Sequence, residues 1–269
     1  MTSIPDEGQQ ILAVMPLHAI TAVYGEQGLR SRLAIETARL DDPPSRQKIS
    51  EALELAGRLH APDRRQHEPY VNHLLRVALR ISCHYGVRDP DVICAALLHD
   101  AVEDHASELA PTGDHPAALA VLAARFGPEV AALVEAVTNP VYLPGQDKDE
   151  QYRAHVAASL AANPRARVIK VSDFTDNGVG IIHTTGPKAV RLARKYAPLV
   201  SVLTDLIARP DTPLTPHVKI LILGQLRTAQ QRFAAIAPPA APGPLALGLQ
   251  SRTRIVGRSC PSGHGHAES

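Results

Sequence analysis

A cluster of one imidazole and three carboxylates at the end of an apolar stretch is the feature that most constrains how this chain folds. Residues 92–98 are aliphatic apart from one cysteine, and His99, Asp100, Glu103 and Asp104 follow them closely. We expect a single helix here, so that His99 lies over Glu103 and Asp100 over Asp104, because residues four apart share a face. Such a cluster is costly to bury unless it holds a cation. Two interpretations stay open: a site for a divalent metal and a polar substrate, or a solvated acidic helix end.

The composition favours a helical protein and excludes several partners. With 269 residues, of which 45% are hydrophobic, the chain is long enough for one large domain, alone or with extensions. Only 3% of the residues are aromatic and none is tryptophan, so the core must be aliphatic and platforms for stacking nucleic-acid bases are scarce. The formal net charge of +1 gives no general attraction for nucleic acid or an anionic membrane. Any recognition of phosphate must therefore be local.

The cysteines and the N-terminal residues indicate a cytoplasmic protein. The three cysteines form no C-x-x-C pair, which argues against both a disulfide framework and a thiolate zinc site. The N-terminus lacks the basic start of a signal peptide, and no stretch reaches the roughly 18 apolar residues of a membrane span. We expect a soluble, cytoplasmic protein with no nucleic-acid or membrane partner, whose oligomeric state the sequence leaves open.

Helical spacing of apolar residues recurs along most of the chain and predicts an all-α fold. Helices are expected over residues 26–39, 45–60, 70–85, 90–104, 115–126, 128–138, 147–162, 165–177, 188–206 and 213–236. We divide the chain into an N-terminal extension (1–44), a helical domain (45–207), a C-terminal helix packing on or flanking that domain (208–236) and a flexible tail rich in Pro and Gly (237–269).

Two further polar residues interrupt apolar helices and extend the acidic cluster into a possible metal site. His73 lies in an early turn of its helix, and Asp173 follows a run of apolar residues. Together with His99 and Asp100 they supply two imidazoles and two carboxylates. This set suits Mn²⁺, Fe²⁺ or Mg²⁺ better than structural zinc.

A metal ion at such a site indicates hydrolytic chemistry, because a bound divalent ion lowers the pKa of its water to about 7. Glu103 lies one helical turn from His99 and could transfer a proton at that water, while Asp104 could orient it. A His-Asp dipeptide alone is weak support, and on its own would fit an ordinary helix end equally well.

The order and spacing of these residues, with their flanking sequences, resemble the HD phosphohydrolase superfamily. More narrowly, they resemble the alarmone hydrolase domain of RelA/SpoT-type proteins and their small hydrolase-only relatives. The matching segments lie within about residues 47–205 and are 68–73 (EPYVNH), 76–78 (RVA), 95–104 (AALLHDAVED), 126–131 (FGPEVA) and 169–173 (IKVSD), with Asn177 beyond them.

The resemblance implies an HD-domain helical bundle that binds Mn²⁺, or another divalent metal such as Fe²⁺ or Mg²⁺. The residues that match the family's metal ligands are His73, His99, Asp100 and Asp173. The resemblance also implies that Glu103 and Asp104 assist attack of water at the 3′-pyrophosphate of guanosine tetra- or pentaphosphate. Arg64 and Asn177 match nucleotide contacts. We expect no synthetase domain, so the protein would degrade the alarmone and not make it.

This chain departs from the family after the last predicted ligand. The family usually shows Asp-Arg-Leu-His-Asn-Met-Arg, whereas residues 173–179 read DFTDNGV, which lacks both arginines and has Asp176 in place of the His. Substrate phosphates would then depend more on Lys170, His183 and Lys188. Two alternatives stay open: a phosphohydrolase for another nucleotide or phosphate ester, and a catalytically silent HD module that regulates.

Overall fold

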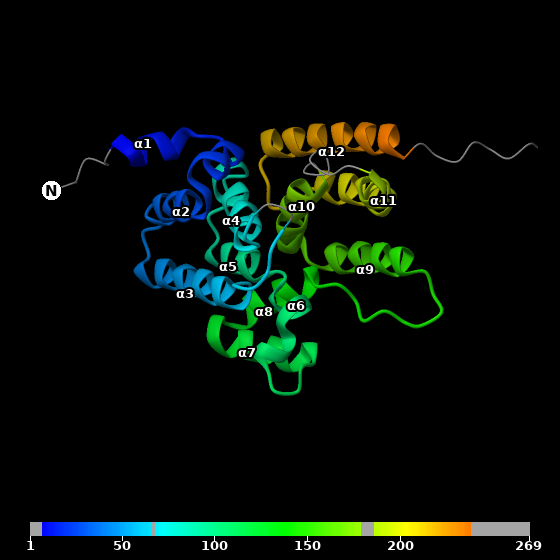
Figure 1. The fold of residues 1–269 in the computed structure, drawn as a ribbon, viewed down its shortest axis with the longest axis horizontal. Helices are drawn as coiled ribbons and strands as arrows, with labels where there is room; N and C mark the ends of the chain where they lie inside the picture. Colours follow the sequence, from blue (N-terminus) through cyan, green and yellow to red (C-terminus); the bar gives the residue numbers. More distant parts are fainter. Residues whose placement is uncertain (1–6, 66–67, 179–185, 238–269) are drawn as a thin grey trace, which may run out of the picture. The chain divides into compact units, whose positions relative to one another are not determined.

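The computed structural model describes residues 7–65, 68–178 and 186–237, and every regular element among them is a helix (Figure 1). The all-α prediction is confirmed. In chain order the helices are α1 (Glu7–Val14), α2 (Leu17–Thr37), α3 (Pro43–Leu59), α4 (Val71–Leu79), the π-helical turn η1 (Arg80–His84), α5 (Pro90–Leu98), α6 (Ala101–Leu109), α7 (His115–Phe126), α8 (Pro128–Val137), α9 (Lys148–Ala162), α10 (Pro164–Gly178), α11 (Gly186–Ala208) and α12 (Pro216–Ile236). None of these helices has the length and apolar character needed to cross a bilayer.

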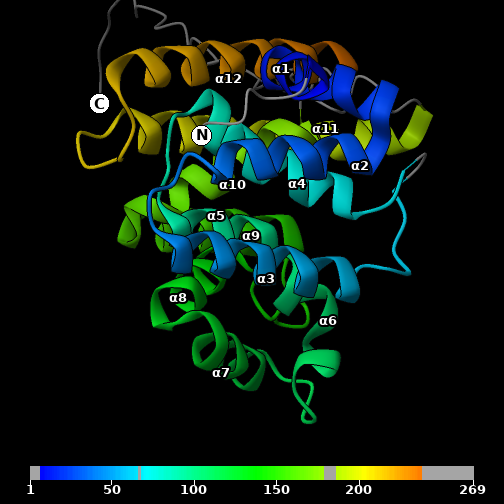
Figure 2. The ribbon, with the colours of Figure 1, turned by 90° about the vertical axis from the view of Figure 1, so that its left-hand side faces the viewer.

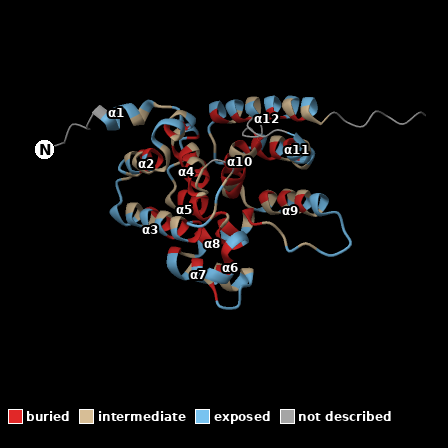
Figure 3. Cartoon of the chain, viewed as in Figure 1, coloured by how far each residue is buried: buried red, intermediate tan, exposed pale blue. Residues whose placement is uncertain are grey.

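Helix α5 is the centre of the aliphatic core. All its side chains from Val92 to Leu98 are buried (Figure 3), as expected of a helix that is apolar on every side. It packs against α3, α4, α8 and α10, which surround it. The residues that follow α5 are therefore delivered into the interior, and this is where His99 and Asp100 lie.

Side-chain caps start several helices where the sequence predicts them. The Asp89 carboxylate accepts hydrogen bonds from the backbone N–H groups of Asp91 and Val92, and Pro90 occupies the first helical position. The Asp147 and Thr215 side chains cap α9 and α12 in the same way. These local interactions explain why the predicted and observed starts of these helices agree closely.

The single helix expected over residues 90–104 is wrong: α5 ends at Leu98, and α6 begins at Ala101. His99 and Asp100 form a turn between the two helices, and a side-chain hydrogen bond fixes each of these residues in place. The His99 ring donates from Nδ1 to the carbonyl of Ala96 over 2.9 Å, and the Tyr70 hydroxyl donates to Asp100 over 2.8 Å. The interruption turns both side chains toward the neighbouring helices.

The N-terminal residues form two helices, where one over residues 26–39 was expected. Helix α2 bends at Gly25, whose φ of 58° suits glycine, and its Ile20, Leu29 and Leu33 are buried in the same core as the central helices. Figure 2 shows α2 beside α4, with which it packs. The boundary proposed at residue 44 stays a prediction, but the helix before it contributes to the core. At the other end, α12 packs along α11 (Figure 1).

Candidate metal centre

The four predicted ligands come together from three parts of the fold. His73 lies on α4, His99 and Asp100 in the turn after α5, and Asp173 on α10. The Asp173 Oδ1 atom is 3.4 Å from His73 Nε2 and 3.6 Å from His99 Nε2. The Asp100 Oδ2 atom is 3.1 Å from His99 Nε2 and 3.7 Å from His73 Nε2. All four side chains thus present donor atoms to one small volume.

Both imidazoles are oriented as metal ligands usually are. His73 donates from Nδ1 to the Asp176 carboxylate over 2.9 Å, and His99 donates from Nδ1 to the Ala96 carbonyl over 2.9 Å. These bonds direct each Nε2 into the site, where an ion can take the place of a proton, and both Nε2 atoms are buried without a hydrogen-bond partner. A carboxylate or carbonyl on the far nitrogen is the usual support of a metal-bound histidine. The residues therefore fit a divalent cation.

The charges of the site also call for a cation. Burial alone would lower the pKa of His99, but Asp100 and Asp173 outweigh it and raise that pKa to about 10. Although burial opposes it, Lys170 and the two histidines hold the pKa of Asp173 well below its usual range. The two histidines likewise lower the pKa of Asp100 although burial opposes them, so both carboxylates are ionised and attract positive charge to the position between the histidines.

Asp176 supports His73, a role that the sequence analysis missed. Its carboxylate is 5% exposed and accepts hydrogen bonds from His73, Arg76 and Arg80. These partners keep the pKa of Asp176 well below its usual range, although burial opposes them. Arg76 is held in turn by two bonds to Glu68. The signal was present in the sequence, since Arg76 and Arg80 lie four apart on one helical stretch and share a face.

The two predicted catalytic carboxylates lie at the start of α6 and are exposed. Glu103 accepts hydrogen bonds from the backbone and side-chain amides of Asn139. Desolvation and the charge of Asp100 raise the pKa of Glu103, and the same causes with Glu103 itself raise the pKa of Asp104 to about 6. A carboxyl group with a pKa near the working pH can both accept and donate a proton, as the predicted role requires.

Of the two adjacent arginines, the structure brings Arg65 to the site. Arg65 donates from Nη2 to the Asn177 Oδ1 atom over 2.6 Å, and Asn177 donates from Nδ2 to Asp173 Oδ1 over 2.5 Å. Arg64, the predicted nucleotide contact, has an exposed side chain, and its backbone bridges to Pro69. Substrate binding by Arg64 stays a prediction, while Arg65 is linked through Asn177 to Asp173, one of the candidate ligands.

Three other residues were predicted to contact the substrate phosphates: Lys170, His183 and Lys188. Lys170 is buried, with its Nζ atom 3.1 Å from Asp173 Oδ2 and 5.5 Å from the centre of the Tyr152 ring. Lys195 lies 4.7 Å from the same ring, so both ammonium groups gather at Tyr152. Lys188 is exposed on α11, and His183 lies outside the described residues.

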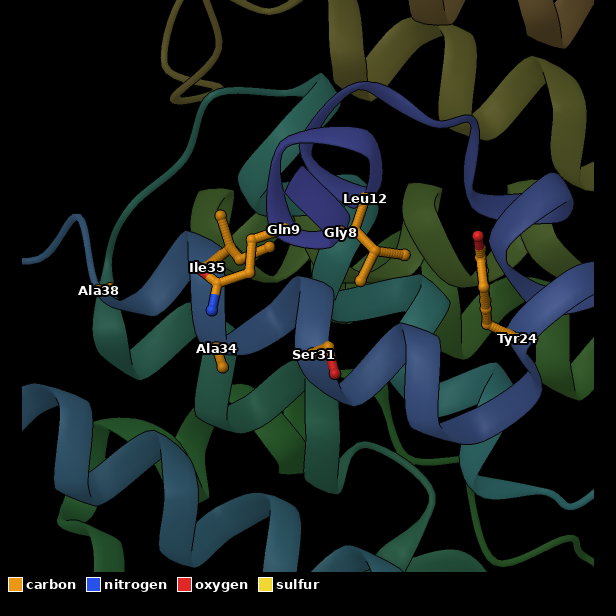
Figure 4. Close-up of a pocket in the computed structure, with 8 residues that line it drawn as sticks. All are labelled: Gly8, Gln9, Leu12, Tyr24, Ser31, Ala34, Ile35 and Ala38. Atoms are coloured by element: carbon orange, nitrogen blue, oxygen red, sulfur yellow. The ribbon is translucent and has the colours of Figure 1, made fainter. Parts of the chain in front are cut away.

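A separate cavity of about 530 Å³ lies between α1 and α2 (Figure 4). Its lining includes none of the predicted site residues and consists of Gly8, Gln9, Leu12, Tyr24, Ser31, Ala34, Ile35 and Ala38. Among the described residues that line it, Tyr24 alone has an ionisable side chain, so these residues do not provide the groups needed for metal-assisted hydrolysis.

Comparisons with known proteins agree with this site. A family model described as HD domain matches residues 52–196. The chain is 35% identical over 133 residues to guanosine-3′,5′-bis(diphosphate) 3′-pyrophosphohydrolase MESH1 of Drosophila melanogaster, covering 48% of this chain and 67% of the relative. It is 35% identical over 129 residues to the human protein of the same name, covering 47% of this chain and 65% of that protein.

A longer bacterial relative and a solved structure also match. Guanosine-3′,5′-bis(diphosphate) 3′-pyrophosphohydrolase of Aquifex aeolicus is 33% identical over 163 residues, which is 58% of this chain and 22% of that protein. A solved structure described as a metazoan ortholog of SpoT that hydrolyzes ppGpp and plays a role in starvation responses superposes with a TM-score of 0.52 at 28% identity. The superposition covers 69% of this chain and 95% of that one. The chain thus matches about two thirds of the length of its short relatives.

Proposed function

Because the chain belongs to the HD-domain family, we propose that it hydrolyses the 3′-pyrophosphate of guanosine 3′,5′-bis(diphosphate), with Mn²⁺ as its metal ion. The observation that carries the proposal is the pair of buried, unpartnered Nε2 atoms of His73 and His99 facing two ionised carboxylates. The short relatives named above carry this activity in their names. The imidazole and carboxylate donors suit Mn²⁺, with Fe²⁺ and Mg²⁺ as alternatives.

In this proposal His73, His99, Asp100 and Asp173 hold the ion. When bound, the ion supplies Lewis-acid chemistry, which activates water and offsets the charge of the phosphoryl oxygens. Glu103 and Asp104 accept the proton from the attacking water and return one to the leaving group; the pKa of Asp104, about 6, suits proton transfer near neutral pH, and the pKa of Glu103 is raised as well.

The remaining polar residues position the substrate and the ligands. Arg65 and Asn177 lie beside Asp173 and offer a guanidinium and an amide to the nucleotide. Lys170 offers an ammonium group on the other side of Asp173. Asp176 keeps the proton of His73 on Nδ1, so that Nε2 stays free to bind the ion.

The test is pyrophosphate release from guanosine 3′,5′-bis(diphosphate) by the purified chain with Mn²⁺. We expect equal amounts of pyrophosphate and guanosine 5′-diphosphate, no product from His99→Ala, and unchanged activity for His217→Ala, an exposed histidine on α12. Absence of product from a wild-type protein that contains metal would refute the substrate assignment. A wild-type protein that binds no metal would instead favour the silent regulatory module.

One observation favours a second candidate, an HD phosphohydrolase for another nucleotide or phosphate ester. Phe174 takes the place of the family's first arginine after the last predicted ligand, and its ring packs in the core against Tyr196 and Phe233, with centroid distances of 5.8 and 6.2 Å. No cation is therefore available at that position. A substrate panel with Mn²⁺ that shows preference for a nucleoside monophosphate or a nicotinamide dinucleotide phosphate would support this candidate.

A further inference from the structure

A second cluster of metal-ligating side chains lies outside the site described above. His60 follows the last residue of α3, Asp63 lies in the next loop, and His105 lies on α6. One ligand atom from each lies within 4.8 Å of the others. Both rings are buried, whereas the Asp63 side chain is 33% exposed, so solvent can reach the cluster from the Asp63 side.

The donor atoms of this cluster converge on one point. Asp63 Oδ2 is 2.8 Å from His60 Nδ1 and 2.7 Å from His105 Nε2, and the two nitrogens are 3.2 Å apart. Tetrahedral zinc bonds of about 2.0–2.1 Å place the ligand atoms about 3.3 Å apart. The distance between the two nitrogens already fits this spacing, and each nitrogen–oxygen distance needs to lengthen by about 0.5–0.6 Å.

His105 is arranged as a metal-bound histidine commonly is. Its other ring nitrogen, Nδ1, lies 3.0 Å from Glu108 Oε2, so a carboxylate is placed to hold a proton on Nδ1 when an ion takes the place of the proton on Nε2. The backbone of α6 leaves helical geometry at His105, with φ −133° and ψ 28°, and the ring then packs edge-on against His60 at 4.4 Å.

We propose that His60, Asp63 and His105 form a second metal site, which takes Zn²⁺ with water in the fourth position. Two imidazoles and one carboxylate around an open position form a common ligand set for zinc. The site is separate from the candidate metal centre but connected to it through Tyr70. The Tyr70 ring stacks on His60 at 4.8 Å, and its hydroxyl donates to Asp100.

The experiment measures bound zinc per chain after the metal-free, full-length protein is dialysed against micromolar Zn²⁺. We expect about two ions in the wild type, about one in His99→Ala, about one in His105→Ala, and none in the double variant. His217→Ala, which removes an exposed histidine far along the sequence from both clusters, should bind as much zinc as the wild type.

Two milder variants keep the test decisive if His105→Ala fails to fold, which far-UV circular dichroism would reveal. In the His99→Ala background, Asp63→Asn should remove the remaining ion. Glu108→Gln should weaken its affinity about 10- to 100-fold, the usual effect of losing a carboxylate behind a ligating histidine. The proposal is overturned if His99→Ala binds no zinc, or if adding Asp63→Asn to it leaves the bound zinc unchanged.

Discussion

Replacing Asp176 with asparagine tests whether the charge behind His73 tunes the candidate metal centre. Asparagine keeps the shape of the side chain but removes its charge and turns an amide N–H₂ toward donors. His73 lies 2.9 Å from the Asp176 carboxylate, and Arg76 and Arg80 each reach it at 3.0 Å or less. Loss of a carboxylate behind a metal-binding histidine weakens metal affinity about 10- to 100-fold. We expect Mn²⁺ binding to Asp176→Asn to weaken by that factor.

The same substitution also costs stability, and the structure sets the size of that cost. Breaking a buried ion pair costs about 3–5 kcal/mol when the partner is left uncompensated. Arg76 keeps its two bonds to Glu68, however, and Arg80 keeps its bond to the Ser172 carbonyl. We therefore expect a cost at or below the lower limit of that range, about 2–3 kcal/mol, in the free energy of unfolding by urea in the presence of EDTA.

Glu68→Gln is the matched control, because in the described part of the chain Glu68 accepts hydrogen bonds from Arg76 and Asn72 and not from His73. It should lower stability yet leave the affinity for Mn²⁺ within about twofold of wild type, as judged by isothermal titration calorimetry. Equal losses of affinity in Glu68→Gln and Asp176→Asn would refute the argument. The charge of Asp176 would then act through general stability and not through His73.

Three further predictions follow from the site. Asp104→Asn should be more stable than wild type at pH 7 in EDTA, by a few tenths to about 1 kcal/mol because the side chain is exposed. Folding raises the pKa of the wild-type Asp104 carboxyl group to about 6, so the stability difference between variant and wild type should be absent below about pH 4 and grow as the pH rises through about 6. A stability difference that stays constant across this pH range contradicts the prediction. Mn²⁺ at 100 times its Kd should raise the free energy of unfolding of the metal-free wild type by about 2.7 kcal/mol. Thermal unfolding of His99→Ala should not change when Mn²⁺ is added. An equal increase in Tm for both proteins would mean that the ion binds elsewhere. Arg65→Ala should raise KM at least about tenfold, from the loss of a charge-assisted bond, whereas Arg64→Ala should change it less than twofold. A larger increase in KM for Arg64→Ala than for Arg65→Ala would indicate that Arg64 contacts the nucleotide.

Much of the fold could be predicted because short-range signals fix it. The caps Asp89, Asp147 and Thr215 act within three residues of their position, and the apolar period of α7 and α8 extends over whole helices. The break at His99 depends instead on bonds that include one from Tyr70, which is 29 positions away in the chain. A local pattern contains no signal of that kind, so a continuous helix was the natural expectation.

The sequence was enough to name the four candidate ligands that the structure brings together, but it did not reveal the residues that support them. His73, His99, Asp100 and Asp173 stand out because each places a polar group in an apolar helix or at its end. Asp176 lies on the same helix as Asp173, but its role depends on Arg76 and Arg80 about 100 positions earlier. The choice between Arg64 and Arg65 likewise depends on the direction of a loop, because adjacent residues point to different sides.

The central claim is tested most directly by the rate of pyrophosphate release from guanosine 3′,5′-bis(diphosphate) as Mn²⁺ is titrated into metal-free protein. We predict that the rate rises from zero and saturates as the candidate metal centre fills, and that His99→Ala shows no rise at any concentration of Mn²⁺. A rate that does not depend on Mn²⁺, or a His99→Ala variant as active as wild type, would contradict the account.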